Sequence, residues 1–428
     1  MLNTEKTWRT AEHVSEGHPD KFCDQVADRI LDEALELAGD DDSRSRVRTA
    51  IECLAKDNLL IVSGEVGFSK KIKSEINIHD LAREVWKRVG YGNGDELTVV
   101  NHLRHQSGHI SQGVDIGGAG DQGIMVGYAT NEKINGSDNK LLMPLEWVLA
   151  RDICYELRNL RLQNKLSWLR TDCKSQVTVN EKGEVVGVII AAQHAEVAGS
   201  DHEKAGELEE MERAIIGQAI QPVIFPDLSS ANSLKIDKQK EEFKTGEKKE
   251  VRRHYFINGI TDSPIRVVIN GTGEFAIGGT IGDAGVVGRK IVVDAYGPQI
   301  PVGGGAYSGK DPTKVDRSAA YMARYIAKTL VAEGEANQCL VKIAYGIGRR
   351  EPEMFTVITD KGALSSKFHS RFIELLSPKR IIDGFRLRKP TGKFEKADPQ
   401  TWSYFQTAAY GHYGRDIFPW EQPGSFIE

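Results

Sequence analysis

The stretch GGGAYSGKDPTKVDRSAA, residues 303–320, sets glycines, two lysines and an acid directly ahead of a helical pattern. The run KIVVDAY (290–296) that precedes it is rich in β-branched residues and predicts a strand. Apolar side chains then recur at every fourth position across 322–330, which predicts a helix that ends at Gly334. A strand, a glycine-rich loop and a helix in this order present backbone N–H groups to phosphate.

The glycine-rich loop is close to a P-loop but differs from one. Residues 304–310 match the pattern G-x-x-x-x-G-K, yet Asp311 follows where a P-loop needs Ser or Thr to bind magnesium. The loop instead offers Lys310 and Lys314 as cations for phosphate and Asp316 as a carboxylate for a metal. The alternative is a flexible surface loop with solvated charges. The short spacing of cations and acid favours a binding role.

Composition limits the class of protein. The chain has 428 residues and a formal net charge of −5, so we expect two to four domains and neither a nucleic-acid nor a membrane partner. Its five cysteines are scattered, without a C-x-x-C pair, which favours a reduced cytoplasmic protein over a disulfide scaffold or zinc site. The beginning of the chain is polar and resembles no signal segment.

Helical and strand patterns are mixed along the chain, which predicts an α+β fold rather than a repeated βαβ array. A polar, glycine-rich segment (107–123) predicts a functional loop or lid, or, for its first half, a linker. The dense mixed-charge run at 235–253 predicts a solvated face or mobile insertion. The aromatic tail, 408–420, is too apolar for a disordered end. We expect helices at 24–37, 78–89 and 145–162, and strands within 47–66 (turning near 56–58) and at 124–130, 176–180 and 185–192.

Several short motifs offer chemistry, and each has a structural alternative. SEGHPDK (15–21) packs His18 and Asp20 into one turn at the start of a helix, where an acid can simply cap the helix or can bind a hard cation. Glu52 and Glu65 interrupt apolar strand patterns, so each acid either pairs with a structural Lys or Arg or binds a cation or amine. Asp172 and Lys174 are as consistent with a surface ion pair as with a site.

The second glycine-rich stretch, GGTIGDAGVVGRKIVVD (278–294), carries an acid and two adjacent cations. Asp283 lies between glycines, which permit close backbone approach to a ligand, and Arg289 and Lys290 suit phosphate oxygens. The candidate site then has five cations against three acids, which suits a polyphosphate with Mg²⁺. The cations are Lys174, Arg289, Lys290, Lys310 and Lys314, and the acids are Asp20, Asp283 and Asp316.

These motifs together resemble those of the S-adenosylmethionine synthetase (methionine adenosyltransferase) family. SEGHPDK, GAGDQG, the block from 278 to 320 and the tail AAYGHYGRDIFPW occur in the family's order and span residues 12–420. The resemblance implies three similar α/β domains with pseudo-threefold symmetry. It places them at 5–107, at 108–273 with a charged insertion at about 195–255, and at 274–428.

The resemblance also implies roles for individual residues at matching positions. Leaving-group chemistry is implied for His18, Lys174, Arg289, Lys290, Lys310 and Lys314. Contacts to ATP are implied for His18, Asp172, Lys174, Glu274, Phe275, Asp283, Arg289, Lys290, Ala306 and Lys310, and contacts to methionine for Glu65, Gln106, Asp283 and Lys314. Asp121 is implied as a further active-site acid, Asp20 and Asp316 as ligands of magnesium, and Glu52 as a ligand of potassium.

The implied reaction joins ATP and L-methionine. The methionine sulfur attacks the ribose C5′, tripolyphosphate leaves, and it is then hydrolysed to phosphate and pyrophosphate. Two Mg²⁺ ions and K⁺ are the implied cofactors. The family forms its site between two subunits, so a homodimer or a tetramer of two dimers is implied, with a gating loop at residues 106–115.

Three departures from the family pattern stand out: Glu274 where Arg is usual, Val302 where His is usual, and the charged insertion. Two other functions remain open from the residues alone. One is an NTPase or phosphotransferase built on the G-x-x-x-x-G-K match. The other is a non-catalytic regulatory subunit of the same fold, which should have lost some of the reactant-handling residues that this chain retains.

Overall fold

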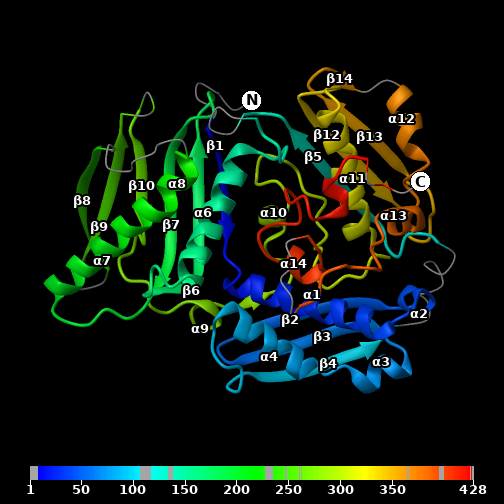
Figure 1. Cartoon of the computed structure of the whole chain (residues 1–428), viewed down its shortest axis with the longest axis horizontal. Helices are drawn as coiled ribbons and strands as arrows, with labels where there is room; N and C mark the ends of the chain where they lie inside the picture. Colours follow the sequence, from blue (N-terminus) through cyan, green and yellow to red (C-terminus); the bar gives the residue numbers. More distant parts are fainter. Residues whose placement is uncertain are drawn as a thin grey trace.

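The computed structural model describes residues 8–106, 117–133, 138–226, 235–245, 248–259, 261, 263–363, 366–394, 400–424 and 426. Three β-sheets with helices packed on them surround a central region of loops and short helices (Figure 1). Within the described residues no helix is both long enough and apolar enough to cross a bilayer. All five cysteines are buried free thiols, as expected for a reduced protein. The predicted α+β class is confirmed.

The first sheet has the strand order β11-β2-β3-β4. β2 and β3 form the predicted hairpin, whose turn places Asp57 at a positive φ of 52°. Alternate residues such as Cys53 and Val62 are buried against α1, as a strand period of two requires. The elements are α1 (Pro19–Ala38), α2 (Asp41–Ser45), β2 (Arg48–Lys56), β3 (Leu59–Gly67), α3 (Lys70–Glu75), α4 (Ile78–Val89), β4 (Thr98–His105) and β11 (Gly285–Val286).

The second sheet has the order β1-β6-β7-β10-β9-β8 and is covered by α6, which spans the predicted 145–162. Most of its strands pair antiparallel, but β7 and β10 run parallel. The elements are β1 (Arg9–Val14), α6 (Leu145–Leu162), β6 (Leu169–Val179), β7 (Val185–His194), α7 (Asp201–Ile215), the π-helix η1 (Ile216–Ile220), α8 (Gln221–Ile224), β8 (Lys235–Thr245), β9 (Lys248–Asn258) and β10 (Ile265–Ile269).

The third sheet has the order β14-β13-β12-β5, and the predicted helix after the glycine-rich loop, α11, packs on it. The aromatic tail is buried, with the ring of Trp420 stacked 3.7 Å from that of Tyr321. Together with short helices of the central region, the remaining elements are β5 (Gly123–Thr130), α9 (Gly279–Gly282), α10 (Ile291–Asp294), α11 (Val315–Ala332), β12 (Gln338–Tyr345), β13 (Met354–Thr359), β14 (Gly362–Ala363), α12 (Ser366–Ile373), α13 (Pro378–Gly384), α14 (Tyr404–Thr407) and the 3₁₀ helix η3 (Pro419–Glu421).

The three sheets are not three consecutive segments of chain. β1 near the beginning of the chain pairs with β6 of the second sheet, β5 pairs with β12 of the third sheet, and β11 pairs back onto β2 of the first sheet. The chain therefore passes through the central region several times. These crossings bring the glycine-rich segments next to α1.

The strand predicted at 290–296 is wrong, because this segment contains the short helix α10. Its β-branched residues have no strand partner in the central region, and the Asp294 carboxylate, almost fully buried, accepts a hydrogen bond from Lys21 Nζ at 2.5 Å. Tertiary contacts decide such short segments over β-propensity.

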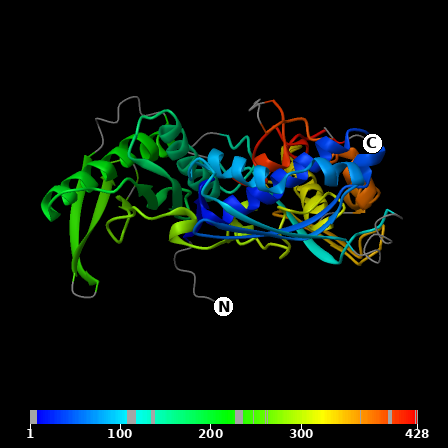
Figure 2. The ribbon, with the colours of Figure 1, turned by 90° about the horizontal axis from the view of Figure 1, so that it is seen from below.

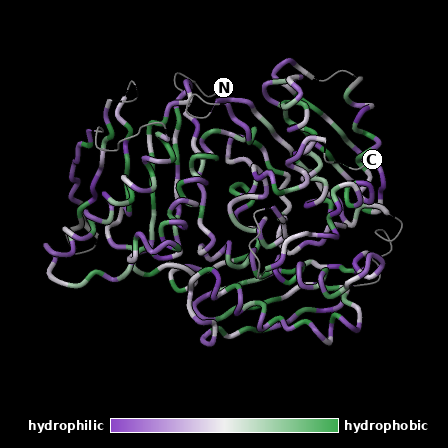
Figure 3. Tube along the Cα trace, viewed as in Figure 1, coloured by the Kyte–Doolittle hydropathy of each residue, from purple (hydrophilic) through white to green (hydrophobic). Residues whose placement is uncertain are grey.

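The mixed-charge run forms strands β8 and β9 at the edge of the second sheet, rather than an irregular insertion. The described side chains of β8 are mostly exposed and the strand is mostly hydrophilic (Figure 3), which agrees with the predicted solvated face. Charged residues on an edge strand discourage pairing with another chain. In Figure 2 the hairpin extends beyond the layer of strands formed by the first and third sheets.

Candidate active site

The beginning of α1 fixes the first candidate residues in place. His18 is the N-cap, and its Nδ1 accepts a hydrogen bond from the backbone N–H of Asp20 at 3.1 Å. Pro19 occupies the first helical turn, where its missing N–H is not needed. The carboxylate of Asp20 accepts a hydrogen bond from the backbone N–H of Val286 at 2.9 Å. The motif SEGHPDK thus caps the helix and also holds the second glycine-rich stretch.

Two further acids on the same face of α1 continue this arrangement. Asp24 accepts from the N–H of Gly288 and Asp28 from the N–H of Gly309, both at 2.9 Å. Gly309 has a φ of 83°, and a Cβ on it would come within 2.2 Å of the carbonyl oxygen of Ile51. Only glycine fits such a position. One helix face therefore positions both glycine-rich loops.

Seven predicted residues form a first cluster around the beginning of α1. Lys290 Nζ lies 2.6 Å from the carboxylate of Asp20, and Arg289 lies 3.5 Å from the same group. Asp172, near the beginning of β6, accepts from the N–H of Gly279 at 2.8 Å. The first cluster comprises His18, Asp20, Asp172, Lys174, Asp283, Arg289 and Lys290.

Electrostatics keep His18 neutral. Burial lowers its pKa to about 2, and the nearby charges of Lys290 and Lys174 act in the same direction. Since Nδ1 accepts a hydrogen bond, the proton of the neutral ring is on Nε2. His18 therefore offers an N–H donor and does not serve as a cation or a general acid.

Asp172 shows the opposite shift. Burial raises its pKa to about 6, partly offset by the hydrogen bond from Gly279 and the charge of Lys174. Its Oδ1 is buried without a hydrogen-bond partner among the described residues. A buried acceptor of this kind is costly unless a ligand supplies a donor.

A second cluster lies at β2 and the beginning of α11 and contains Glu52, Glu65, Lys310 and Asp316. Lys310 Nζ lies 2.6 Å from the carboxylate of Asp316. Glu52 and Glu65 share the outer face of the β2–β3 hairpin and are exposed. Partial burial raises the pKa of Glu52, and the nearby charge of Lys310 opposes this shift.

The first residue after the G-K pair shows that the loop is not a P-loop. Asp311 is fully buried and accepts hydrogen bonds from the N–H of Thr49 at 2.8 Å and from Lys314 Nζ at 2.5 Å. Although burial opposes it, the charges of Lys314 and Arg48 lower the pKa of Asp311 to about 2. This carboxylate anchors the loop to β2 and does not face a phosphate site.

The other predicted residues lie outside both clusters or between them. Ala306 lies beside Gly288, since a Cβ on that glycine would be 2.5 Å from the Ala306 Cβ. Phe275 is half-buried and its N–H bonds to a histidine ring, whereas Glu274 and Asp121 are exposed. Gln106 follows β4 directly and donates its N–H to the carbonyl of Val66. The predicted gating loop beyond it, 107–115, lies outside the described residues.

No hydrogen bond or ion pair joins the two clusters within the described part of the chain. Asp20 and Asp28, which adjoin the first and second cluster respectively, are eight residues apart on α1, or about 12 Å along the helix. The same helix therefore supports two separate groups of charged side chains.

Sequence reasoning missed three buried acids that follow Asp20 along α1. Asp24, Asp28 and Asp32 follow at four-residue steps, and the last accepts from the N–H groups of Tyr404 and Phe405. A polar stripe with helical spacing is the signal that could have identified them. Asp28 also has a side-chain partner. Arg317, fully buried on α11, donates two hydrogen bonds to its carboxylate, at 2.7 and 2.8 Å.

Metal binding has limited support from the chain alone. No group of three or more His, Cys, Asp or Glu side chains among the described residues is arranged to hold a metal ion. Magnesium, however, is often held by one or two carboxylates together with substrate phosphates. The single carboxylates Asp20 and Asp316, each beside cations that also attract phosphate, fit that mode.

Comparison with known proteins finds relatives whose sequences align with nearly the whole chain. Models of the S-adenosylmethionine synthetase N-terminal, central and C-terminal domains match residues 6–108, 116–243 and 277–422. The S-adenosylmethionine synthase of Brachyspira hyodysenteriae is 36% identical over 447 aligned residues, covering 99% of this chain and 97% of that protein. The chain therefore belongs to the S-adenosylmethionine synthetase family and is a methionine adenosyltransferase.

Proposed function

We propose that the sulfur of L-methionine attacks the ribose C5′ of ATP and displaces tripolyphosphate, which is then hydrolysed to phosphate and pyrophosphate. A C–S bond forms, the C5′–O bond breaks, and its electron pair leaves on the tripolyphosphate oxygen. A thioether sulfur is a neutral nucleophile and needs no general base. The chemical difficulty is the charge that develops on the leaving group, and fixed cations stabilise such charge best.

The hydrogen bond from the Asp20 N–H to His18 Nδ1, which puts the proton of a neutral ring on Nε2, is the observation that carries this proposal. An imidazole held neutral among Lys290, Lys174 and Lys21 cannot add a charge, but its Nε2–H can donate to the leaving oxygen. Lys290, Arg289 and Lys174 supply the positive charge around it. We assign Asp172 Oδ1, the buried acceptor without a partner, to the nucleotide.

In this proposal the carboxylates hold the metal ions and the lysines bind phosphate. Asp20 and Asp316 would hold two Mg²⁺ ions and Glu52 would hold K⁺. Bound Mg²⁺ would neutralise phosphate charge and orient its oxygens. The lysines that contact these carboxylates would then be released to bind phosphate, since Lys290 and Lys310 are 17% and 22% exposed at the side chain and have room to move.

We further propose that a homodimer, alone or within a tetramer of two dimers, completes the site. The faces of the first and third sheets that point away from the helices expose apolar side chains, including Leu54 (44% exposed), Ile124 (53%) and Ile358 (40%). Glu52 and Glu65 lie on the same outer face as Leu54. Pairing of these faces would bury the apolar residues and place the second cluster of one subunit against the first cluster of its partner.

The activity test is direct. Purified protein with ATP, Mg²⁺, K⁺ and L-methionine should form S-adenosylmethionine and phosphate together, measured by mass spectrometry and a colorimetric phosphate assay. Phosphate release that is indifferent to methionine would contradict the proposal and favour an NTPase. A folded protein without any product would indicate a non-catalytic subunit.

A complementation experiment tests the shared site. Lys174→Met and Lys310→Met each disable one cluster, and neither homodimer should be active. Mixing the two variants through reversible dissociation should restore about a quarter of the wild-type rate, because about half the dimers are mixed and each mixed dimer has one intact site. If each site were built within one subunit, mixing would restore nothing.

A further inference from the structure

A strongly basic cavity lies apart from both clusters. It has a volume of about 1160 Å³ and is bordered by α2, the beginning of β2, residues 117–118 and α13. Its lining contains eight Lys and Arg side chains and only two Asp side chains. None of the residues of the two clusters lines it, although Thr313 in its wall is next to Lys314.

Two guanidinium groups in the wall are held against each other. Arg48 and Arg388 both donate through NH1 to the carbonyl oxygen of Ser45, at 2.5 and 2.8 Å. Arg388 makes a second such bond to the carbonyl of Arg44 at 2.9 Å. Like charges at this separation repel each other, most strongly where the surroundings exclude water. An anion in the cavity would relieve that repulsion.

Acids near the cavity neutralise only part of its charge, and Asp42 pairs with Arg46 of the lining at 2.5 Å. Asp41 pairs with Lys389 at 2.7 Å, and Asp383 pairs with Lys379 at 2.5 Å. Within the described part of the chain no carboxylate is hydrogen-bonded to Arg388. Burial lowers the pKa of Arg388, and Arg48 lowers it further, while buried Asp311 acts in the opposite direction. The cavity therefore retains a large excess of positive charge.

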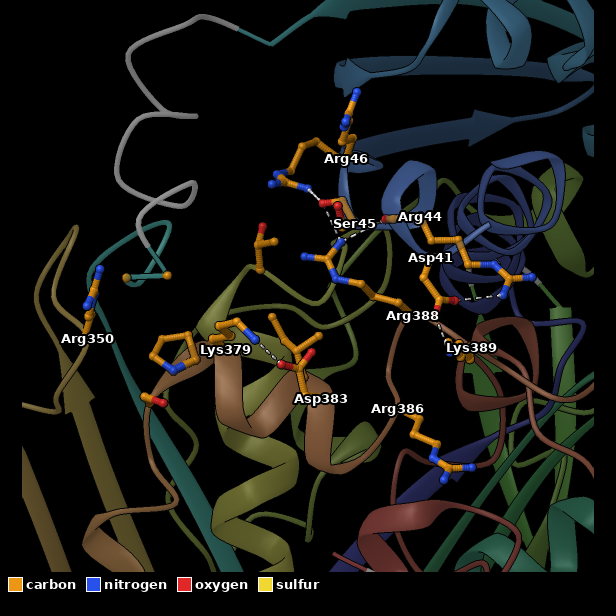
Figure 4. A pocket seen from close by; sticks show the side chains of 17 residues that line it. Asp41, Arg44, Ser45, Arg46, Arg350, Lys379, Asp383, Arg386, Arg388 and Lys389 are labelled. Atoms are coloured by element: carbon orange, nitrogen blue, oxygen red, sulfur yellow. Dashed lines mark hydrogen bonds and ion pairs between the residues drawn. The ribbon is translucent and has the colours of Figure 1, made fainter. Parts of the chain in front are cut away.

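The cations come from separate parts of the chain and surround one space. Figure 4 shows Lys379 from α13, Arg388 from the segment after it, and Arg350 from the loop before β13 around the same opening. Such a spread suits an extended anion with several charges rather than a single carboxylate. Guanidinium groups match the oxygens of phosphate in pairs.

We propose that this cavity is a second anion site, distinct from the active site, that binds an oligophosphate such as pyrophosphate or tripolyphosphate. The proposal rests on the cavity alone and does not require the reaction mechanism given above. The cavity adjoins the active site at Thr313, because the nearby Asp311 interacts electrostatically with Arg48 on one side and with Lys314 on the other.

The test is equilibrium dialysis with labelled pyrophosphate, in a background that carries Lys174→Met and Lys310→Met to weaken binding at the active site. Binding should persist in this background. Lys379→Glu should weaken it about tenfold or more, the loss expected when one charged hydrogen bond is removed. Lys379 and Asp383 are 74% and 58% exposed, so the change should leave folding intact.

Arg380→Glu is the matched control, since it makes the same charge reversal on the neighbouring exposed residue of α13, which does not line the cavity. It should change pyrophosphate binding less than threefold. Lys379→Gln removes the charge without adding one, and should weaken binding in the same direction if Lys379→Glu folds poorly. Turnover with methionine should be unaffected by Lys379→Glu in the otherwise unchanged enzyme, which separates this proposal from the proposed function.

Three outcomes would overturn the proposal. The first is loss of all pyrophosphate binding in the Lys174→Met, Lys310→Met background. The second is an equal effect of Lys379→Glu and Arg380→Glu, which would indicate a general field and not a site. The third is citrate binding as tightly as pyrophosphate, which would reject the phosphate class.

Discussion

Asp20 and Asp28 lie two turns apart on the same face of α1, and they differ in what opposes them. Both are buried and both accept a hydrogen bond from a backbone N–H of a glycine-rich segment. Asp28 faces Arg317 with both side chains fully buried, whereas Asp20 faces Lys290 at 17% exposure and Arg289 at 52%. One helix face thus continues from scaffold to site.

The difference lies in the freedom of the cation. Arg317 is also bonded to Thr407 and to the carbonyl of Lys310, so it cannot leave Asp28. The cations at Asp20 are long side chains with access to solvent, and they can exchange the carboxylate for phosphate. A closed ion pair holds the loops together, and an open pair of the same chemistry is available for a substrate.

The largest expected effect is on folding. Asp28→Asn keeps the shape of the side chain but leaves the charge of Arg317 buried and uncompensated. Breaking a buried pair in this way should lower the free energy of unfolding by about 3–5 kcal/mol. Chemical denaturation followed by circular dichroism measures the change.

The control for this prediction is an exposed pair. Glu333→Gln disrupts the ion pair between Glu333 (39% exposed) and Arg371 (45% exposed). This change should lower the free energy of unfolding by less than about 1 kcal/mol. Equal losses in Asp28→Asn and Glu333→Gln would mean that burial of the α1 pair does not distinguish scaffold from site.

The next effect is on the rate. Lys174 is exposed on β6, so Lys174→Met should leave the thermal midpoint unchanged. Loss of one fixed charge that stabilises the leaving group should lower kcat about 10²- to 10³-fold. Lys165→Met, at an exposed lysine beyond the end of α6, provides the matched control and should retain the wild-type rate. A near-normal rate for Lys174→Met would remove this lysine from the mechanism.

Local patterns in the sequence predicted most of the fold. The helices at 78–89 and 145–162 and the hairpin within 47–66 have the predicted positions because their periodicity reflects burial of one face. The segment 290–296 failed because its environment comes from distant chain, above all from Lys21. The pairing of β1, β5 and β11 with distant strands leaves no local trace and was not predicted.

The candidate site shows the same limit. The cations and acids around Asp20 could be identified because their motifs are short and their spacing is dense. The sequence did not indicate that Asp311 is a buried anchor, because its role depends on the N–H of Thr49 in another element. Nor did it indicate that Lys290 and Lys310 fall in separate clusters, which follows from where α1 places the two loops.

A smaller effect concerns pH. Burial raises the pKa of Asp172 to about 6, so folding favours its protonated form. That contribution to stability is present at low pH and is lost as the pH rises through about 6. Asp172→Asn should therefore unfold at a higher temperature than the wild type near pH 7.5, with the difference disappearing near pH 4.

Ionisation of Asp172 should also affect activity, but here the ionised form is the favourable one. The ionised Asp172 is the form assigned to the nucleotide, so kcat/KM for ATP should fall as the pH drops through about 6, and Asp172→Asn should lack this limb. His18 has its pKa lowered to about 2 and should not contribute to the profile. An acid limb that disappears in His18→Asn and persists in Asp172→Asn would reverse these assignments.

The smallest effect tests the departure at Glu274. The side chain is exposed next to Phe275, outside the first cluster, so solvent and salt should screen its charge from bound triphosphate. Glu274→Arg should lower the KM for ATP about two- to threefold without changing kcat, and the gain should vanish at about 1 M salt. Glu181→Arg, at the exposed turn between β6 and β7, is the control and should have no effect. A change greater than about thirtyfold for Glu274→Arg would place this residue inside the phosphate site, since only a contact that excludes solvent acts so strongly.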